Sequence, residues 1–376
     1  MVELIENTNN NIPEELYKTP YKYICEHYEK MLPCVGSRVF MPLCLLPVSL
    51  IIPKLIINGR EIRIHLNLMW LSPSGYGKST VCREFAKITY NPLVTKKMST
   101  PRLYHELMKK RKGQKTSLVV EDVAVWFMDD EKIKFLEGAT GEEESVSHET
   151  MRNIKDNGNT HTDVSSFCSG TPENITNLRL KEGILRRFSM LVFYLSEEEH
   201  QKILNFIHGG VCNTTKTKDS EEIQAFYKEL KTIQEGLHPK IPQITGYNIP
   251  DYLKSQASEF MRIPASRLHK KYGGNLATEA EQMWRFAVCH AFLNIFNKYE
   301  RGMIKDGILT IDQRDFNVAK FLLKQEISAK FIVLQCIEQL DFYNIKTRET
   351  LREWKTKMKD QDIPPEALFI MESNVK

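Results

Sequence analysis

The stretch Ser72-Pro73-Ser74-Gly75-Tyr76-Gly77-Lys78-Ser79-Thr80 decides the fold of this chain. It follows an apolar run over residues 62–71 that predicts a β-strand, and it precedes a segment that predicts a helix over residues 79–89. A strand, a Gly-rich loop and then Gly-Lys-Ser-Thr make up the P-loop, whose backbone N–H groups wrap a polyphosphate at the positive end of the following helix. The usual first glycine is Ser72 here, and a small residue at that corner keeps the motif intact.

This loop predicts that the chain binds ATP together with Mg²⁺. Lys78 is expected to reach the β- and γ-phosphates, and the Ser79 hydroxyl is expected to bind the metal ion. The residues expected around the nucleotide are Ser74, Gly75, Tyr76, Gly77, Lys78, Ser79 and Thr80. Kinases, switches and motors share such a loop, so the loop alone does not separate these classes.

The composition indicates a globular protein that is large enough for one large or two ordinary domains, at 376 residues with 41% hydrophobic and 27% charged residues. A net charge of +4 is too small to indicate nucleic-acid binding by itself. The eight cysteines are scattered, which argues against a zinc site or a disulfide framework and favours a reducing compartment. No signal peptide or membrane span is evident, so we expect a cytoplasmic protein without membrane contacts.

The order of predicted elements indicates an α/β fold. An Asn58-Gly59 turn predicts a hairpin over residues 55–71 that leads into the loop. Further strands are expected over residues 93–98, 117–125, 164–170 and 187–195, with a helix over residues 102–112. Strands that alternate with helices predict a parallel sheet with helices on both faces. We expect four regions: an N-terminal helical segment (1–54), the P-loop core (55–196), a helical lid (197–345) and a helical tail (346–376).

Two carboxylates end the strand expected over residues 117–125. In P-loop ATPases such a strand delivers one acid to the Mg²⁺ shell, and an adjacent acid activates the attacking water. The usual order is Asp then Glu, whereas this chain has Glu121 then Asp122. By position Glu121 is the metal ligand and Asp122 the base. The inverted order leaves this division of roles open.

Polar and basic residues follow in the next two strands. The strand over residues 164–170 ends near Ser169 and Thr171. In ring ATPases a polar side chain at this tip lies between the two previous strand ends and contacts the γ-phosphate or the water. Further on, Arg186 and Arg187 precede an apolar strand, and either could be an arginine finger that a neighbouring subunit contributes to the site.

Residues 66–80, LNLMWLSPSGYGKST, resemble the entry of a broad prokaryotic and mobile-element family of P-loop primase-helicase-type proteins. More distantly they resemble the MCM helicases and the viral superfamily-three helicases of the AAA+ class. The resemblance covers residues 55–335 and implies an AAA+-like ATPase core with a C-terminal all-α lid domain. The chain departs from the family at Ser72, in the inverted acid pair, and in lacking a visible primase polymerase domain.

The resemblance also assigns roles to three arginines. Residues 183–188, GILRRF, resemble the Arg-Phe finger motif of MCM proteins, which makes Arg187 the finger and Arg186 the alternate. Residues 279–287, EAEQMWRFA, resemble the lid helix whose arginine senses nucleotide, which gives Arg285 that role.

The insert over residues 137–163 is rich in Gly, Asn, Glu and His. In ring helicases this region often carries a hairpin that points into the central channel. Arg152 and Lys155 would then contact the phosphates of a single strand, whereas a solvated surface loop is the alternative.

These features lead to three functional hypotheses. The first is an ATP-dependent DNA helicase or translocase that forms a ring of identical subunits, such as a hexamer. It would act on single-stranded or forked DNA and work with a separate primase or initiator. The second is an ATP-gated replication initiator or assembly protein with slow hydrolysis, which the inverted acid pair favours. The third is a small-molecule kinase, against which the long helical lid and the Arg-Arg-Phe segment argue.

Overall fold

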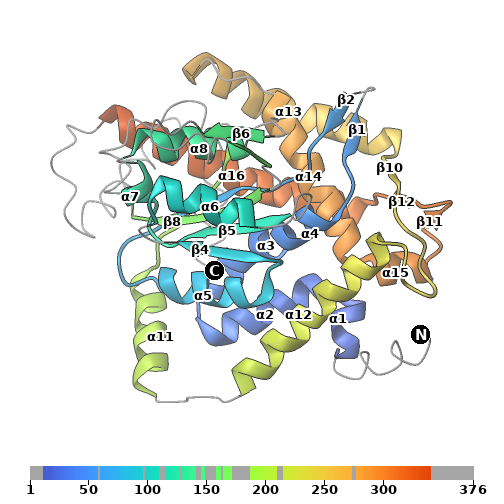
Figure 1. Cartoon of the computed structure of the whole chain (residues 1–376), viewed down its shortest axis with the longest axis horizontal. Helices are drawn as coiled ribbons and strands as arrows, with labels where there is room; N and C mark the ends of the chain where they lie inside the picture. The colour runs from blue at the N-terminus through green and yellow to red at the C-terminus, as the bar shows by residue number, and fades with distance from the viewer. Residues whose placement is uncertain are drawn as a thin grey trace.

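The computed structural model describes residues 12–57, 60–95, 98–109, 115–127, 129–140, 145–148, 158–161, 164–171, 187–209, 215–272 and 277–339. Four helices open this part of the chain, as the sequence predicts: α1 (Glu14–Lys18), α2 (Pro20–Met31), α3 (Gly36–Leu43) and α4 (Leu45–Ile51). They lie below and behind the central sheet in Figure 1. In the described part of the chain, no helix combines the length and apolarity needed to cross a bilayer.

A five-stranded sheet forms the centre of the molecule. Its strands are β4 (Pro92–Thr95), β5 (Thr116–Val120), β8 (Val164–Gly170), β3 (Leu68–Leu71) and β9 (Ser189–Val192), in that spatial order. Every pairing in it is parallel, which confirms the predicted parallel sheet. The strand with the polar tip, β8, lies between β3 and β5, as expected.

Helices cover both faces of this sheet, as the sequence predicts. Side chains alternate along each strand, so Leu68 and Trp70 join one hydrophobic cluster while Met69 and Leu71 join the other. Helices α4 and α5 (Lys78–Ile88) pack on the first face. The second face is covered by α6 (Thr100–Lys109), α7 (Val123–Phe127) and α8 (Asp130–Thr140).

Four predicted strands are shorter than the sequence suggested. Those expected over residues 93–98 and 187–195 cover only 92–95 and 189–192, and the other two end differently. The run over residues 62–71 divides into β2 (Arg60–Ile62), which pairs with β1 (Leu55–Ile57) as the expected hairpin, and β3 (Leu68–Leu71). The strand expected to reach residue 125 ends at Val120 instead. There Asp122 Oδ1 accepts the N–H of Ala124 at 3.2 Å and initiates α7, so the apolar residues that follow belong to a helix.

The C-terminal part is mostly helical. Its helices are α11 (Glu197–His208), α12 (Thr215–Gln234), α13 (Asp251–Tyr272), α14 (Ala277–Leu293), α15 (Ile295–Glu300) and α16 (Gln313–Gln339). The expectation of an all-α region is wrong in one respect, because a small sheet joins β10 (Gly246–Asn248), β12 (Ile308–Thr310) and β11 (Ile304–Lys305). The turn between the last two strands places Asp306 at φ +49° and Gly307 at φ +75°. An Asp-Gly pair between apolar residues is the sequence signal for such a hairpin.

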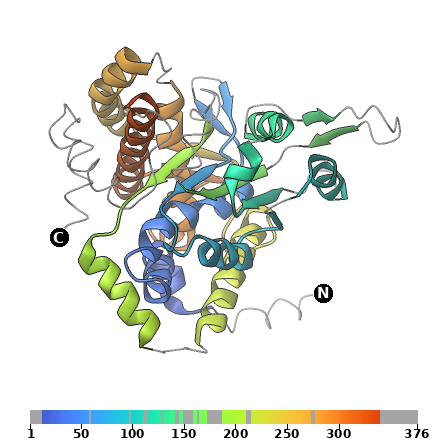
Figure 2. The same cartoon turned by 90° about the vertical axis from the view of Figure 1, so that its left-hand side faces the viewer.

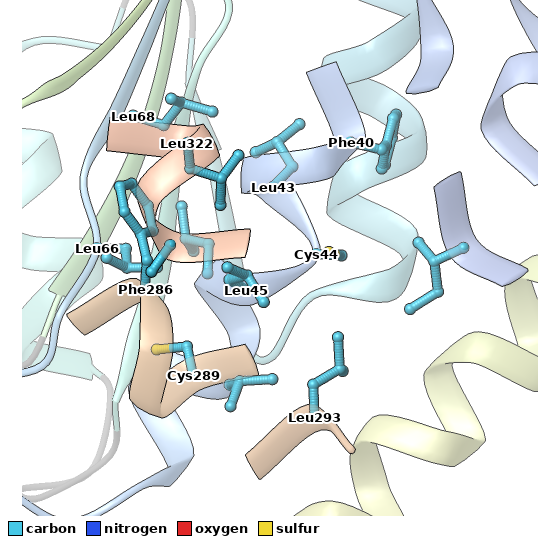
Figure 3. Close-up of a cluster of buried hydrophobic side chains, with 14 of the residues drawn as sticks. Phe40, Leu43, Cys44, Leu45, Leu66, Leu68, Phe286, Cys289, Leu293 and Leu322 are labelled. Carbon is cyan, nitrogen blue, oxygen red and sulfur yellow. The ribbon is translucent and has the colours of Figure 1, made fainter. Parts of the chain in front are cut away.

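One hydrophobic cluster joins the N-terminal helices, the sheet and the C-terminal helices. Figure 3 shows Leu43 from α3 facing Leu68 at the start of β3, with Phe286 from α14 and Leu322 from α16 in the same group and Phe40 on the other side of Leu43. The regions 1–54 and 197–345 that the sequence suggested therefore contribute to a core that they share with the sheet.

A buried ionic network ties the C-terminal helices together. The Asp315 carboxylate accepts from His290 Nδ1 at 2.7 Å and also contacts the Lys298 ammonium. All three side chains are almost completely buried. Lys298 also lies 3.0 Å from Asp312, whose carboxylate contacts the half-exposed Arg301 on its outer side. The network joins α14, α15 and α16.

We expect Asp315→Ala to lower the free energy of unfolding by about 3 kcal/mol, because it leaves the buried charge of Lys298 with less compensation. The matched control is Arg301→Ala, which removes the exposed outer partner and is expected to cost under about 0.5 kcal/mol. Urea unfolding followed by circular dichroism measures both. Equal losses in the two variants would contradict a stabilising role for the buried network.

Candidate functional site

The P-loop follows β3 and needs glycine at two positions. Gly75 has φ +86° and Gly77 has φ +78°, in the left-handed region that glycine adopts without strain. A Cβ on Gly77 would also lie 2.8 Å from the Leu32 side chain, which reaches the loop from the N-terminal helices. The two left-handed glycines turn the chain sharply between β3 and α5. This is the concave backbone that binds anions.

Lys78 closes the loop onto itself. Its ammonium group donates to the backbone carbonyls of Ser72 and Pro73, each at 2.7 Å. The two bonds hold the amine over the loop, with the chain wrapped around it. Helix α5 begins at Lys78, and no side chain caps its N-terminus. The first-turn N–H groups and the amine thus provide the positive potential that a phosphate requires.

The rim of the loop is open to solvent. Ser74, Gly75, Ser79 and Thr80 are exposed, whereas Ser72 is fully buried. The Ser79 hydroxyl is therefore accessible to a metal ion on a bound polyphosphate. Mg²⁺ is typically bound by one or two protein groups together with substrate phosphates, so the residues present fit this ion in the presence of a nucleotide.

Tyr76 has a different role from the one that the sequence suggested. Its side chain is buried, and its hydroxyl accepts the N–H of Leu195 at 3.0 Å. The ring meets His200 of α11 edge-on, with centroids 5.5 Å apart. The side chain thus anchors the loop to the segment after β9. Only the backbone of Tyr76 remains for a nucleotide contact.

Hydrogen bonds connect neighbouring strand ends at the carboxyl edge of the sheet, where its five strands end. The Ser169 hydroxyl donates to the Glu121 carbonyl at 2.8 Å, and the Glu121 N–H donates to the Thr95 carbonyl at 3.0 Å. The Ser72 N–H donates to the Gly170 carbonyl at 3.2 Å. These bonds fix the start of the P-loop relative to the ends of β4, β5 and β8. Ser169 therefore holds the acidic strand end with its hydroxyl, and Thr171 follows at the rim.

A buried thiol that the sequence analysis did not single out, Cys82, links α5 to the tip of β8. Burial raises the pKa of Cys82 to about 12, against a smaller lowering by its hydrogen bond with Ser169. The Cys82 sulfur lies 3.5 Å from the Ser169 hydroxyl, which donates to the Glu121 carbonyl, so α5 and the end of β5 meet through Ser169. Cys82 is one helical turn after Lys78, and that spacing is the signal that could have placed it.

The two acids are not equivalent. Glu121 is half-buried and its backbone is held by Ser169 and Thr95, whereas one Asp122 oxygen accepts the N–H that initiates α7. Glu121 thus lies at the carboxyl edge of the sheet, the edge from which the P-loop also starts. Asp122 lies next to it, with its carboxylate directed at the start of a helix.

Arg187 lies at the opposite, amino edge of the sheet, where the strands begin. It precedes β9, whose first residue pairs with the first residue of β3, and its guanidinium donates to the Glu137 carbonyl of α8. The P-loop follows the other end of β3. The structure therefore does not bring Arg187 to the P-loop of its own chain. Arg186 lies outside the described residues.

Arg285 also lies at the amino edge. In the preceding turn of α14, Gln282 donates to the Ser189 hydroxyl at 2.6 Å, at the start of β9. Nearby, burial together with the charges of Lys115, Arg63 and Arg285 lowers the pKa of His65 to about 3. The resemblance placed Arg285 at the nucleotide, but the structure does not bring it to the P-loop of its own chain, because α14 packs against the beginning of β9.

The central insert contains a hairpin. Its strands β6 (Ser145–His148) and β7 (Gly158–His161) pair antiparallel. Figure 2 shows these green strands standing out from the body at the upper right. Arg152 and Lys155 fall between the two strands, outside the described residues.

Comparison with known proteins gives no further information on this site. No protein-family model matches the sequence, and a search of curated proteins found no match.

Proposed function

We propose that the chain is an Mg²⁺-dependent ATPase of the AAA+ class that hydrolyses ATP between the subunits of a ring and moves along DNA. The observation that carries this proposal is the P-loop closed around Lys78, with Glu121 directly after the end of β5, two places from β3 in the sheet and at the same carboxyl edge. A loop of this form binds polyphosphate, and a nearby carboxylate serves a bound metal ion.

The residues suggest how the site would work. The loop backbone and Lys78 would hold the β- and γ-phosphates, and Ser79 with Glu121 would hold Mg²⁺. The bond from Ser169 keeps Glu121 in register with the loop. Phosphoryl transfer depends mainly on such positioning and on charge stabilisation, for which the protein supplies prearranged groups.

The positions of the arginines favour a site shared between subunits. Strand β3 alone separates Arg187 from the loop of its own chain by about 13 Å, the rise of its four residues, and the guanidinium donates to α8. The positive charge that stabilises the negative charge developing on the γ-phosphate would therefore come from Arg187 of a neighbouring copy. Arg285 lies at the same edge and would also act toward a neighbour, as part of a C-terminal lid region.

The hairpin between the acidic strand and β8 supports an interaction with DNA. It stands out from the body, and the residues between its strands include Arg152 and Lys155. We infer that this hairpin contacts the phosphates of single-stranded DNA in the ring. A separate primase or initiator would load the ring.

A second candidate is an ATP-gated initiator or assembly protein with slow hydrolysis. The engagement of Asp122 with the N-terminus of α7 favours it, because that carboxylate is partly committed and is a weaker candidate for the general base. ATP turnover with and without single-stranded DNA, together with strand separation on a forked duplex, distinguishes the two candidates. A motor is expected to turn over faster with DNA and to separate the fork.

The proposal is tested by measuring ATP hydrolysis with Mg²⁺ and with EDTA, and the molecular mass with and without a slowly hydrolysed ATP analogue. We expect Mg²⁺-dependent turnover and assembly in the presence of the analogue. A chain that remains monomeric under both conditions at micromolar concentration would contradict the ring ATPase.

Ser169 offers a test of site alignment. We expect Ser169→Ala to lower kcat for ATP about tenfold with little change in KM, because the Glu121 carbonyl loses its buried hydrogen bond and the acid loses its register. Ser165→Ala is the matched control: it removes another buried serine hydroxyl from the same strand, at the amino end, where the partner is Ser49 at 3.1 Å. If both variants lose activity equally, alignment of Glu121 is not the cause.

A further inference from the structure

Helix α11 stands apart from the body of the protein. Figures 1 and 2 both show it at the periphery, directly after β9. Ile203 is the only buried residue of this helix. Among the described elements, no helix or strand packs along its length. A helix of twelve residues is only marginally stable in water without tertiary packing, so the stability of α11 in this position needs an explanation.

The base of α11 is firmly held. Ser196 and Glu199 form a reciprocal capping box, in which the Ser196 side chain accepts from the Glu199 N–H and the Glu199 side chain accepts from the Ser196 N–H. The Glu199 carboxylate also pairs with Arg38 at 2.5 Å. Just before the helix, the Leu195 N–H donates to the hydroxyl of Tyr76 from the P-loop. The helix is thus attached rigidly to the P-loop.

The outer half of α11 carries exposed apolar side chains. Leu204 is 46% exposed and Ile207 is 64% exposed. They are three residues apart, so they lie on the same face of the helix. Phe206 is partly buried beside them. A helix whose base is held by hydrogen bonds and whose outer end exposes apolar side chains is suited to contact another protein, and we call α11 the arm.

Charge indicates what this arm contacts. A basic residue precedes each of three strands at the amino edge: Arg63 before β3, Lys115 before β5 and Arg187 before β9. Acidic residues follow two of the same strands at the carboxyl edge: Glu121 and Asp122 after β5, and the exposed Glu197 and Glu198 after β9, in the first turn of α11. Copies arranged head to tail would bring the acidic edge of one against the basic edge of the next.

We propose that α11 is an arm that grips the amino edge of a second copy of this chain, with Leu204 and Ile207 as its apolar contacts. This inference rests on the proposed function, since the same arrangement brings Arg187 of the second copy to the P-loop beside the base of the arm. Through Tyr76, the arm connects the phosphate-binding loop directly to the contact between subunits.

The test compares the wild type with Leu204→Ser/Ile207→Ser. The matched control is Ile56→Ser/Leu237→Ser. It removes two apolar side chains that are 65% and 66% exposed, one from β1 and one from the turn after α12. Sedimentation velocity is measured with Mg²⁺ and a slowly hydrolysed ATP analogue, and analogue binding is measured separately by calorimetry. We expect the arm variant to need at least tenfold more protein to assemble, while its binding of the analogue at low protein concentration stays within twofold. The control is expected to assemble like the wild type.

A second measurement identifies what the arm contacts. Ile207→benzoylphenylalanine, irradiated in the presence of the analogue, is expected to give a crosslinked dimer in which mass spectrometry finds peptides from the amino edge. A crosslink to the same chain or to added single-stranded DNA would overturn the proposal, as would assembly of the arm variant at wild-type concentrations. A wild type that binds the analogue but never assembles overturns the arm and leaves nucleotide binding intact. A wild type that does not bind the analogue overturns the proposed function itself.

Discussion

Lys78→Ala is expected to lower ATP hydrolysis about a thousandfold. The substitution removes the positive charge at the phosphates, and a single such donor is worth about a hundredfold to a thousandfold in rate. It also removes both hydrogen bonds that close the loop, to the Ser72 and Pro73 carbonyls. The loop then loses the shape that orients its N–H groups, so we expect ATP affinity to fall as well. Steady-state hydrolysis and calorimetric binding of an ATP analogue measure the two losses.

Lys87→Ala is the control for this experiment. Lys87 lies on the same helix, α5, and its ammonium pairs with Glu84 at 2.7 Å on the exposed side. Its replacement removes the same charge from the same helix without touching the loop, and we expect hydrolysis within twofold of the wild type. Thermal unfolding of both variants tests whether the fold is retained. A folded Lys78→Ala protein that still hydrolyses ATP at the wild-type rate would exclude this loop as the active site.

Arg187→Ala is expected to lower hydrolysis about a thousandfold while leaving ATP binding nearly unchanged. An arginine finger stabilises charge that develops on the γ-phosphate only in the transition state, so its loss appears in kcat. The substitution also removes the bond to the Glu137 carbonyl. Arg187→Lys, which still offers a donor to that carbonyl, therefore accompanies it, since a finger needs the planar guanidinium and a structural anchor does not.

Mixing the two inactive variants gives the sharpest test of a shared site. In an equal mixture of Lys78→Ala and Arg187→Ala chains, about a quarter of the interfaces would combine an intact Lys78 from one copy with an intact Arg187 from the next. We expect hydrolysis to reappear in the mixture, in proportion to these interfaces. If the mixture stays as inactive as its components although it assembles, Arg187 does not act across the interface.

Local patterns predicted the framework of this protein well. The P-loop motif and the parallel sheet covered on both faces follow from apolar runs and turn residues that are close in sequence, whereas the position of β8 between β3 and β5 was expected from the likeness to ring ATPases. The end of β5 was misplaced, because the apolar residues after Asp122 are equally compatible with a strand and with the short helix that Asp122 initiates. The small sheet of the C-terminal region was missed although its Asp306-Gly307 turn is visible in the sequence.

The sequence by itself determined that a Gly-rich loop ending in Lys78 follows one strand and that Glu121 follows another strand of the same sheet, because both depend on residues that are adjacent in the chain. Only the tertiary structure decided that the Tyr76 hydroxyl bonds to Leu195 and that the Ser169 hydroxyl holds the Glu121 backbone. The same is true of the position of Arg285 at the amino edge of the sheet. These outcomes depend on which buried donors and acceptors meet across long sequence separations. A buried polar group must find a partner, and the packed fold alone determines which one it finds.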